Sequence, residues 1–257
     1  MAIKYKVGFI SDVHGNLSAL ETVKADLKFQ GIEMCYCLGD VIGYGPDPRA
    51  CLDEVREIAD VIIMGNHEAA IHQLDLLKYM NNLALVSREL ALKQLTTDDL
   101  DFIEKLPEID IIEIEGLNIA LAHGSFRPPH ALNYVENFGY AQADLDKMAA
   151  SDLAITACFI GHMHIPKIYG RRSNQNVTSF DPEELIFQKD CLYSINVGSV
   201  GQPRDSDNRA AYGILQIETD QIRYYLRRLN YDYQATQKKI IAAGLPALLA
   251  QRLKDAF

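Results

Sequence analysis

The chain has 257 residues, 48% of them hydrophobic and 23% charged, which is ordinary for a globular protein. Its net charge of −10 argues against binding to long nucleic acids or acidic membranes, because phosphate contacts need lysine and arginine side chains. Five cysteines without a CxxC pair, no signal peptide and no apolar run long enough to cross a bilayer predict a cytoplasmic protein. Nothing in the sequence indicates the oligomeric state.

The first quarter of the chain alternates between strands and helices. The segment "YKVGFISD" predicts a buried strand, and "NLSALETVKADLKFQ" predicts an amphipathic helix that ends at Gly31. A strand at "MCYCLGD", a helix at "DPRACLDEVREIA" and a strand at "DVIIMGNH" follow in turn. This alternation is typical of α/β layers built on a mainly parallel sheet.

The pattern changes after the third strand. Residues 69–106 predict an insertion of helices, and "IDIIEIEGLNIALAHGS" predicts two strands that turn at Glu115-Gly116. Residues 170–190 are polar and are expected to form an irregular surface loop.

The final segments predict a hairpin and then helices. The hairpin is "AAYGILQIETDQIRYYLRRL", and residues 231–257 predict two short helices broken at 244–246. Because the chain has no linker and no internal repeat, we expect one domain spanning residues 1–257.

Five predicted strands end in side chains that can bind a metal, and these ends use five of the seven histidines. The carboxyl ends of strands in α/β sheets are where ligands bind. His162 and His164 lie two residues apart in "FIGHMHIP", so in an extended strand they would point to one face. An isolated pair of this kind is also typical of buried structural histidines, and the other strand ends favour a metal site. In chain order, the side chains are Asp12, His14, Asp40, Asn66, His67, His123, His162 and His164.

The types of these side chains indicate the chemistry. Oxygen and imidazole ligands without thiolates favour ions such as manganese, iron, cobalt, nickel or zinc. Seven such ligands exceed what one ion takes from a protein, and they suit two ions that share a carboxylate. Two ions roughly 3.5–4 Å apart form a clamp for in-line displacement at phosphorus.

The order of the motifs D-x-H, G-D, G-N-H-[DE], H-G and G-H-x-H resembles that of the calcineurin-like metallophosphoesterase superfamily, from residue 8 to about 210. The resemblance implies a four-layer αββα sandwich of two mixed β-sheets flanked by helices. It implies that His67 donates a proton to the leaving group or stabilises the transition state, after a hydroxide held between two metals attacks phosphorus. The implied ligands are Asp12, His14 and His164 for one metal, Asn66, His123 and His162 for the other, and Asp40 as the bridge.

One departure from the family pattern indicates which branch of the superfamily the sequence resembles. Ser/Thr protein phosphatases and the symmetrical diadenosine tetraphosphatases carry an arginine, and an acidic or amide residue, soon after the G-D motif. Residues 39–46, "GDVIGYGP", have neither. This run and "NVGSVGQPRD" at 196–205 are similar to a bacterial and archaeal group of phosphoesterases and phosphodiesterases.

We therefore expect an enzyme that hydrolyses a small phosphodiester with two divalent ions, manganese being the expected metal. Phosphomonoesters, dinucleoside polyphosphates and phosphoproteins are the alternative substrates. A non-catalytic scaffold, such as the retromer subunit with this fold, is the alternative from another class. The presence of His67 and of all seven ligands favours the enzyme.

Four further residues are candidates for substrate contacts: Asn16, Tyr44, Arg204 and Arg209. Each also has a structural interpretation. Asn16 could instead cap the helix that follows it, Tyr44 could pack within its loop, and the arginines could form surface ion pairs. The amides of the glycine-rich segment 196–205 could face a phosphate, or the segment could be only a tight turn.

Overall fold

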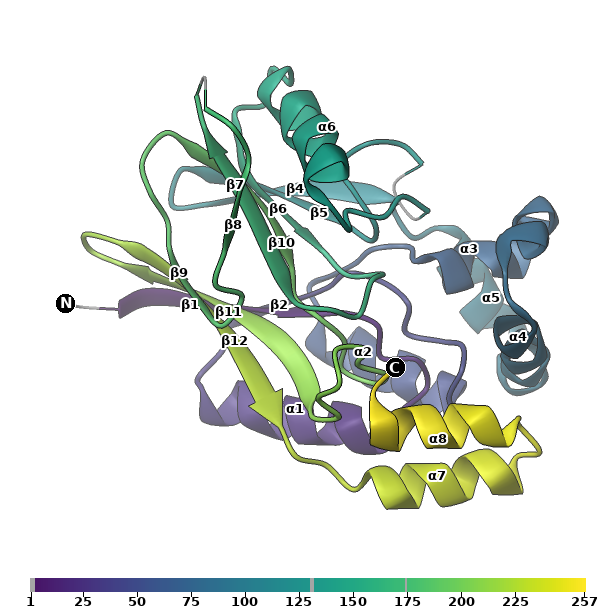
Figure 1. Ribbon diagram of the computed structural model, residues 1–257. Helices are drawn as coiled ribbons and strands as arrows, with labels where there is room; N and C mark the ends of the chain where they lie inside the picture. Colours follow the sequence, from purple (N-terminus) through teal and green to yellow (C-terminus); the bar gives the residue numbers. More distant parts are fainter. Residues whose placement is uncertain (1–2, 130–131, 174) are drawn as a thin grey trace.

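Two six-stranded β-sheets lie face to face and carry helices on their outer faces (Figure 1). The computed structural model describes residues 3–129, 132–173 and 175–257. Helix α6 (Phe138–Ala149) lies on one sheet, and α1 (Leu17–Phe29) and α2 (Pro48–Ile58) lie beneath the other. The predicted four-layer αββα sandwich is confirmed.

Each sheet combines three parallel strands with antiparallel neighbours, so both sheets are mixed. The parallel sets are β1–β2–β3 in the first sheet and β5–β6–β10 in the second. The first sheet consists, in spatial order, of β3 (Val61–Ile62), β2 (Met34–Cys37), β1 (Ile3–Ile10), β11 (Ala210–Glu218), β12 (Ile222–Leu229) and β9 (Glu184–Ile186). The second consists of β4 (Ile109–Ile114), β5 (Leu117–Ala122), β6 (Ile155–Ile160), β10 (Cys191–Asn196), β7 (Lys167–Arg172) and β8 (Thr178–Phe180).

The alternation of side chains along the strands creates separate cores on the two faces of each sheet. Phe9 of β1 and Phe159 of β6 point between the sheets, where their rings stack with centroids 3.8 Å apart. The next residues, Ile10 and Ile160, point outward to the covering helices. Burying one such phenylalanine contributes about 1.5–3 kcal/mol, so these stacked rings help to fix how the sheets face each other.

Two groups of helices flank one end of the sandwich. The helices predicted between 69 and 106 are present as α3 (Asn66–His72), the 3-10 helix η1 (Leu74–Tyr79), α4 (Asn82–Gln94) and α5 (Thr97–Glu104). The two predicted C-terminal helices are α7 (Tyr233–Ala242) and α8 (Ala247–Asp255), which run side by side at the bottom of Figure 1. In the part of the chain that the structure describes, no helix is long and apolar enough to cross a membrane.

The expectation of an irregular loop at 170–190 is wrong. This segment completes β7 and adds β8 and β9, which become the edge strands of the two sheets. Both added strands have only three residues and are largely exposed. Short, polar edge strands protect a sheet from pairing with other chains, and their polarity conceals the strand pattern.

Candidate metal centre

The side chains predicted to bind metals converge at one end of the sandwich. The parallel strands of both sheets end there, and five of them (β1, β2, β3, β5 and β6) are each followed by a turn that carries one or more of these side chains. Seven of the eight are buried and Asn66 is partly buried. The convergence of buried carboxylates and imidazoles from five strand ends makes this the candidate functional site.

A first group consists of Asp12, His14 and His164. Nε2 of His14 lies 3.0 Å from Nε2 of His164, and Oδ1 of Asp12 lies 3.2 Å from Nε2 of His164. One ligand atom from each of the three residues falls within 4.8 Å of the others. Such spacing allows all three atoms to bind one ion.

A second group lies beside the first. Nε2 of His123 is 3.2 Å from each of three atoms: Oδ2 of Asp40, Nδ1 of His162 and Oδ1 of Asn66. Oδ2 of Asp40 is also 3.7 Å from Nε2 of His14, in the first group. The structure thus places Asp40 between the two groups, and it brings His162 and His164 to different groups.

Three of the histidines are oriented by backbone carbonyl groups. The Nδ1–H of His14, His123 and His164 donates to a carbonyl, which turns Nε2 toward the centre as the atom that can bind a metal when it carries no proton. The accepting oxygens belong to Ile42, Leu38 and Gln202, at 3.1, 2.8 and 2.5 Å, respectively.

Two buried polar atoms at the centre have no hydrogen-bond partner among the described residues: Oδ1 of Asp12 and Nε2 of His162. Buried polar atoms without a partner are costly, so a ligand is the physical explanation for them. The donor set of oxygens and imidazole nitrogens, without thiolates, fits two divalent ions.

Five of the candidate ligand residues have left-handed backbone conformations, with φ between 49° and 66°: Asp12, His14, Asp40, His162 and His164. Residues other than glycine rarely adopt this backbone conformation, which costs about 1–3 kcal/mol per residue. His162 and His164 follow the predicted strand rather than extending it, because β6 ends at Ile160 and both histidines lie in a strained turn. Strain of this kind persists when function requires it.

Neighbouring charges shift the pKa values of the carboxylates and histidines at the centre. Burial raises the pKa of Asp40, but the neighbouring His123 and His67 outweigh it and hold that pKa well below its usual range. Burial lowers the pKa of His123, but Asp40 outweighs it and raises this pKa to about 9. Without a metal, the ring of His123 is therefore doubly protonated and positively charged at pH 7. A divalent cation bound there would supply the positive charge instead.

Glu68 is a positioning residue that the sequence interpretation missed. Its buried carboxylate accepts hydrogen bonds from the backbone N–H groups of Asp40, Ile42 and Gly65 at 2.8, 3.0 and 3.0 Å. It thereby joins the turn after β2 to the turn after β3. The available signal was the acidic residue that ends the G-N-H-[DE] motif.

His67 lies between the metal ligands and a cavity. Its ring is 4.9 Å from that of His14, and its backbone N–H donates to Oδ1 of Asp40 at 2.9 Å. A Cβ atom at Gly43 would lie 2.1 Å from Nδ1 of His67, so this contact requires glycine. Burial lowers the pKa of His67 against the opposing effect of Asp40, so its ring is neutral at pH 7 and can donate a hydrogen bond.

The cavity beside His67 has a volume of about 520 Å³. Asn66, His67 and His162 border it on the metal side. Tyr134, another residue that the sequence did not indicate, stacks on His162 with ring centroids 4.0 Å apart. The remaining walls are largely aromatic and aliphatic side chains, which include Tyr44, Leu76, Tyr79, Met80 and Leu132.

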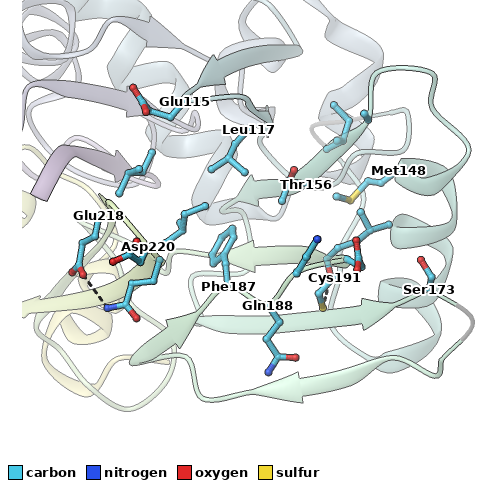
Figure 2. A pocket seen from close by; sticks show the side chains of 18 of the residues that line it. Glu115, Leu117, Met148, Thr156, Ser173, Phe187, Gln188, Cys191, Glu218 and Asp220 are labelled. Carbon is cyan, nitrogen blue, oxygen red and sulfur yellow. Dashed lines mark hydrogen bonds between the residues drawn. The ribbon is translucent and has the colours of Figure 1, made fainter. Parts of the chain in front are cut away.

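A larger cavity, of about 780 Å³, lies at the opposite end of the sandwich (Figure 2). Glu115 and Asp220, labelled in Figure 2, lie at the turns of two β-hairpins that border it. In the described part of the chain, no cluster of potential metal ligands lies at this cavity. Its greater volume does not make it the candidate site.

Two of the four candidate substrate contacts, Asn16 and Arg209, have hydrogen-bond partners within the protein, and a third, Tyr44, lies at the cavity. Asn16 is buried and caps α1 by accepting from the backbone N–H of Ala19, and its amide donates to the carbonyl of Gly201. The helix cap considered for Asn16 is therefore observed, and its side-chain amide is hydrogen-bonded within the protein. Arg209 forms a forked ion pair with Asp207. Tyr44 packs against His14 and His67 and also borders the cavity.

The glycine-rich segment 196–205 is hydrogen-bonded to the turn that carries Asp12. The backbone N–H groups of Val200 and Gly201 donate to the carbonyls of Ser11 and Asp12, at 2.9 Å each. These two amides are therefore not available to a phosphate. Arg204, which follows, has its guanidinium 5.7 Å from the Tyr44 ring, so it alone of the two candidate arginines lies beside the site.

Comparison with known proteins gives consistent matches. Residues 5–220 match the profile of the calcineurin-like phosphoesterase superfamily domain. An uncharacterized protein of Methanocaldococcus jannaschii is 31% identical over 251 residues, which cover 98% of each chain. A metallophosphoesterase structure from Sphaerobacter thermophilus is 34% identical with a TM-score of 0.77, over 98% of this chain and 99% of that one. A hypothetical protein from Pyrococcus horikoshii shares the fold, with a TM-score of 0.76 and 16% identity over 99% of each chain.

Family match and site geometry together define a metal-dependent phosphoric ester hydrolase. The chain belongs to the calcineurin-like phosphoesterase superfamily. The relatives named above are bacterial and archaeal proteins, and none is a Ser/Thr protein phosphatase, which agrees with the prediction from residues 39–46.

Proposed function

We propose that the protein hydrolyses a small phosphodiester at a centre of two divalent metal ions. Asp12, His14 and His164 would hold one ion, and Asn66, His123 and His162 the other. Asp40 would bind both. The observation that carries the proposal is the convergence of buried donor atoms into adjacent groups, which a third group of His14, Asp40 and His67 links, largely on strained turns.

Two divalent ions bound there would polarise the phosphoryl oxygens and supply an activated water as the nucleophile. The protein's own part is to orient the ester and to assist the departure of the leaving group. His67 borders both the centre and the cavity, and its neutral ring can donate a hydrogen bond to the departing oxygen. Of the two roles expected for His67, stabilisation of the transition state through this hydrogen bond has the better physical support, because a neutral imidazole is a poor proton donor.

The cavity supports a diester over a monoester. Its aromatic and aliphatic walls suit a second, apolar or ring-bearing ester group beside the reacting phosphate. A monoester or a dinucleoside polyphosphate would also reach the metals but would use these walls differently. A scaffold protein would gain nothing from strained ligand turns and unpartnered buried atoms, so these features favour an enzyme.

We propose manganese as the physiological metal because the ligands are oxygen and imidazole groups. We also propose a cytoplasmic location, which is supported by five cysteines that are all buried and unpaired.

The test combines metal counting with turnover. The protein would be treated with a chelator and reloaded with manganese, nickel, cobalt, zinc or magnesium. Hydrolysis of bis-p-nitrophenyl phosphate and p-nitrophenyl phosphate would then be compared. We expect two ions per chain, metal-dependent turnover and faster hydrolysis of the diester.

His164→Ala removes a ligand from the first group only, and His162→Ala removes one from the second group only. Each variant should therefore retain about one ion per chain. Loss of both ions in each variant would contradict the separate assignment of the two histidines. A protein that binds two ions but hydrolyses neither ester with any metal would contradict the enzymatic proposal.

A further inference from the structure

The last helix of the chain reaches the candidate site. Leu249 and Leu253 of α8 pack in one apolar cluster with Tyr44 and with Ala84 of α4. Tyr44 in turn contacts the rings of His14 and His67. Packing through this tyrosine therefore fixes α8 next to the metal centre, although α8 lies outside the family match at 5–220.

This packing brings two arginines to the same tyrosine. Arg252 of α8 interacts with the Tyr44 side chain. Arg204 comes from the segment after β10, where its backbone N–H donates to the carbonyl of His164 at 3.1 Å. Burial and then the positive charge of Arg204 lower the pKa of Arg252, which is consistent with two guanidinium groups in close proximity.

Neither arginine is neutralised by the protein. Among the described residues, no carboxylate lies within 4.0 Å of either guanidinium, whereas the nearby Arg209 and Arg228 pair with Asp207 and Asp205. The Nε atoms of Arg204 and Arg252 are both buried without a hydrogen-bond partner in the described structure. Arg204 also donates from Nη2 to Oε1 of Gln202 at 3.1 Å, an uncharged partner. Two cations near one tyrosine, each with a buried Nε that lacks a partner, indicate a binding site for an anion in this acidic protein.

We propose that Arg204 and Arg252 bind a second phosphate group of the substrate, beside the phosphate that reacts at the metals. Planar guanidinium groups bind phosphate through paired hydrogen bonds, which two arginines on one tyrosine can supply together. The inference rests on the proposed function and specifies it: the substrate is a small phosphodiester that carries a further phosphate. Arg204 and Arg252 are binding residues, and the metals act on the other phosphate.

The test is direct binding to the manganese-loaded protein, measured by calorimetry. The probes are the bisphosphates of 1,3-propanediol, 1,4-butanediol and 1,6-hexanediol, each compared with its monophosphate. The series covers several separations between the two phosphates. For at least one length, we expect the bisphosphate to bind about tenfold or more tightly than the monophosphate. A tenfold preference requires only about 1.4 kcal/mol, which hydrogen bonds between a guanidinium group and a phosphate can supply.

Arg252→Gln and Arg204→Gln should each reduce this preference to about the twofold statistical advantage of two equivalent phosphates. Lys254→Gln is the matched control, since it removes the same charge from an exposed position of α8 and should keep the wild-type preference. Arg252→Lys, which keeps the charge but loses the planar fork, should give an intermediate value. Thermal unfolding and metal content would show that each variant is folded and loaded.

A preference of about twofold at every length in the wild type, or an unchanged preference in both Arg→Gln variants, would overturn the inference. Because binding of the probes and hydrolysis of the nitrophenyl esters are measured separately, the two proposals can fail separately. Preferential binding without hydrolysis of any ester would support the phosphate subsite and contradict the enzymatic function. Hydrolysis without preferential binding would do the reverse.

Discussion

The two ends of the β-sandwich are both hollowed, yet they hold their polar side chains in opposite ways. At the metal end, Asp12 and Asp40 are buried on left-handed turns. At the other end, Asp220 is exposed and Glu218 accepts a hydrogen bond from Gln221 (Figure 2). The second end has the larger cavity, of about 780 Å³ against 520 Å³. Unsatisfied and strained groups, rather than volume, identify the site.

The largest effect should come from removing the shared carboxylate. We expect Asp40→Ala to lose metal and to reduce turnover of bis-p-nitrophenyl phosphate by about 1,000-fold or more, because both ions depend on this residue. Asp220→Ala, the same substitution at the other cavity, should change turnover less than twofold. Equal effects of the two substitutions would contradict the distinction between the ends. Metal analysis by mass spectrometry and steady-state kinetics are the measurements.

His67→Ala should reduce turnover by about 100-fold or more while leaving the metal content near two ions per chain, because the side chain assists the reaction without holding a metal. Mass spectrometry of the metals and single-turnover kinetics of the loaded variant would separate the two properties. A variant that loses its ions would show that His67 is a ligand.

Two glycines with positive φ provide a matched comparison of the ends. Gly43 has φ +87° and contacts His67, whereas Gly116 has φ +79° with nothing within 4 Å of an added Cβ. Alanine at Gly116 should cost about 1–2 kcal/mol of stability for the left-handed backbone alone, and alanine at Gly43 should cost more, because its Cβ would also clash with His67. Only Gly43→Ala should displace the histidine, and we expect turnover to fall by about tenfold. Similar kinetics in the two variants would contradict the role of Gly43; urea unfolding supplies the stability values.

The smallest effect concerns a buried carboxylate outside the metal centre. Burial raises the pKa of Asp144 from 3.8 to about 6, against the opposing charge of Arg127. The folded protein thus binds a proton more tightly than the unfolded chain, and this contribution to stability is lost as the pH rises from about 4 through 6. It amounts to at most about 3 kcal/mol.

Asp144→Asn should remove this pH dependence, so its stability relative to the wild type should rise between pH 4.5 and 7.5. Urea unfolding of both proteins at the two pH values measures the change. Asp146→Asn is the control, because Asp146 is exposed on the same helix and its pKa is lowered by the hydrogen bond from Arg171. The same rise in both variants would assign the effect to the helix rather than to burial.

The convergence of the candidate metal ligands was predictable because each of them follows a strand of recognisable pattern. Parallel strands bring their carboxyl ends together, so residues as distant as His14 and His164 meet without any signal beyond strand order. The β4–β5 and β11–β12 hairpins were predictable for a related reason, since each has a clear turn between two apolar runs.

The features that were missed depend on packing between distant segments. Strands β8 and β9 have only three residues each, too few for a periodic pattern. Tyr134 and Arg252 are adjacent in sequence to no motif, and only the folded chain brings them to His162 and Tyr44. The turn geometry of His162 was also hidden, because positive φ values have no sequence signature outside glycine and asparagine.

The packing of α8 on Tyr44 has a consequence for how relatives can diverge. All candidate metal ligands lie between residues 12 and 164, whereas Arg252 belongs to a helix beyond residue 220, where the family match ends. On the proposal that Arg252 binds a phosphate of the substrate, substitutions in that helix would alter substrate choice without altering the metal centre. Two members with identical ligand motifs would then have different substrates, and the sequence after residue 220 is where such specialisation should be sought.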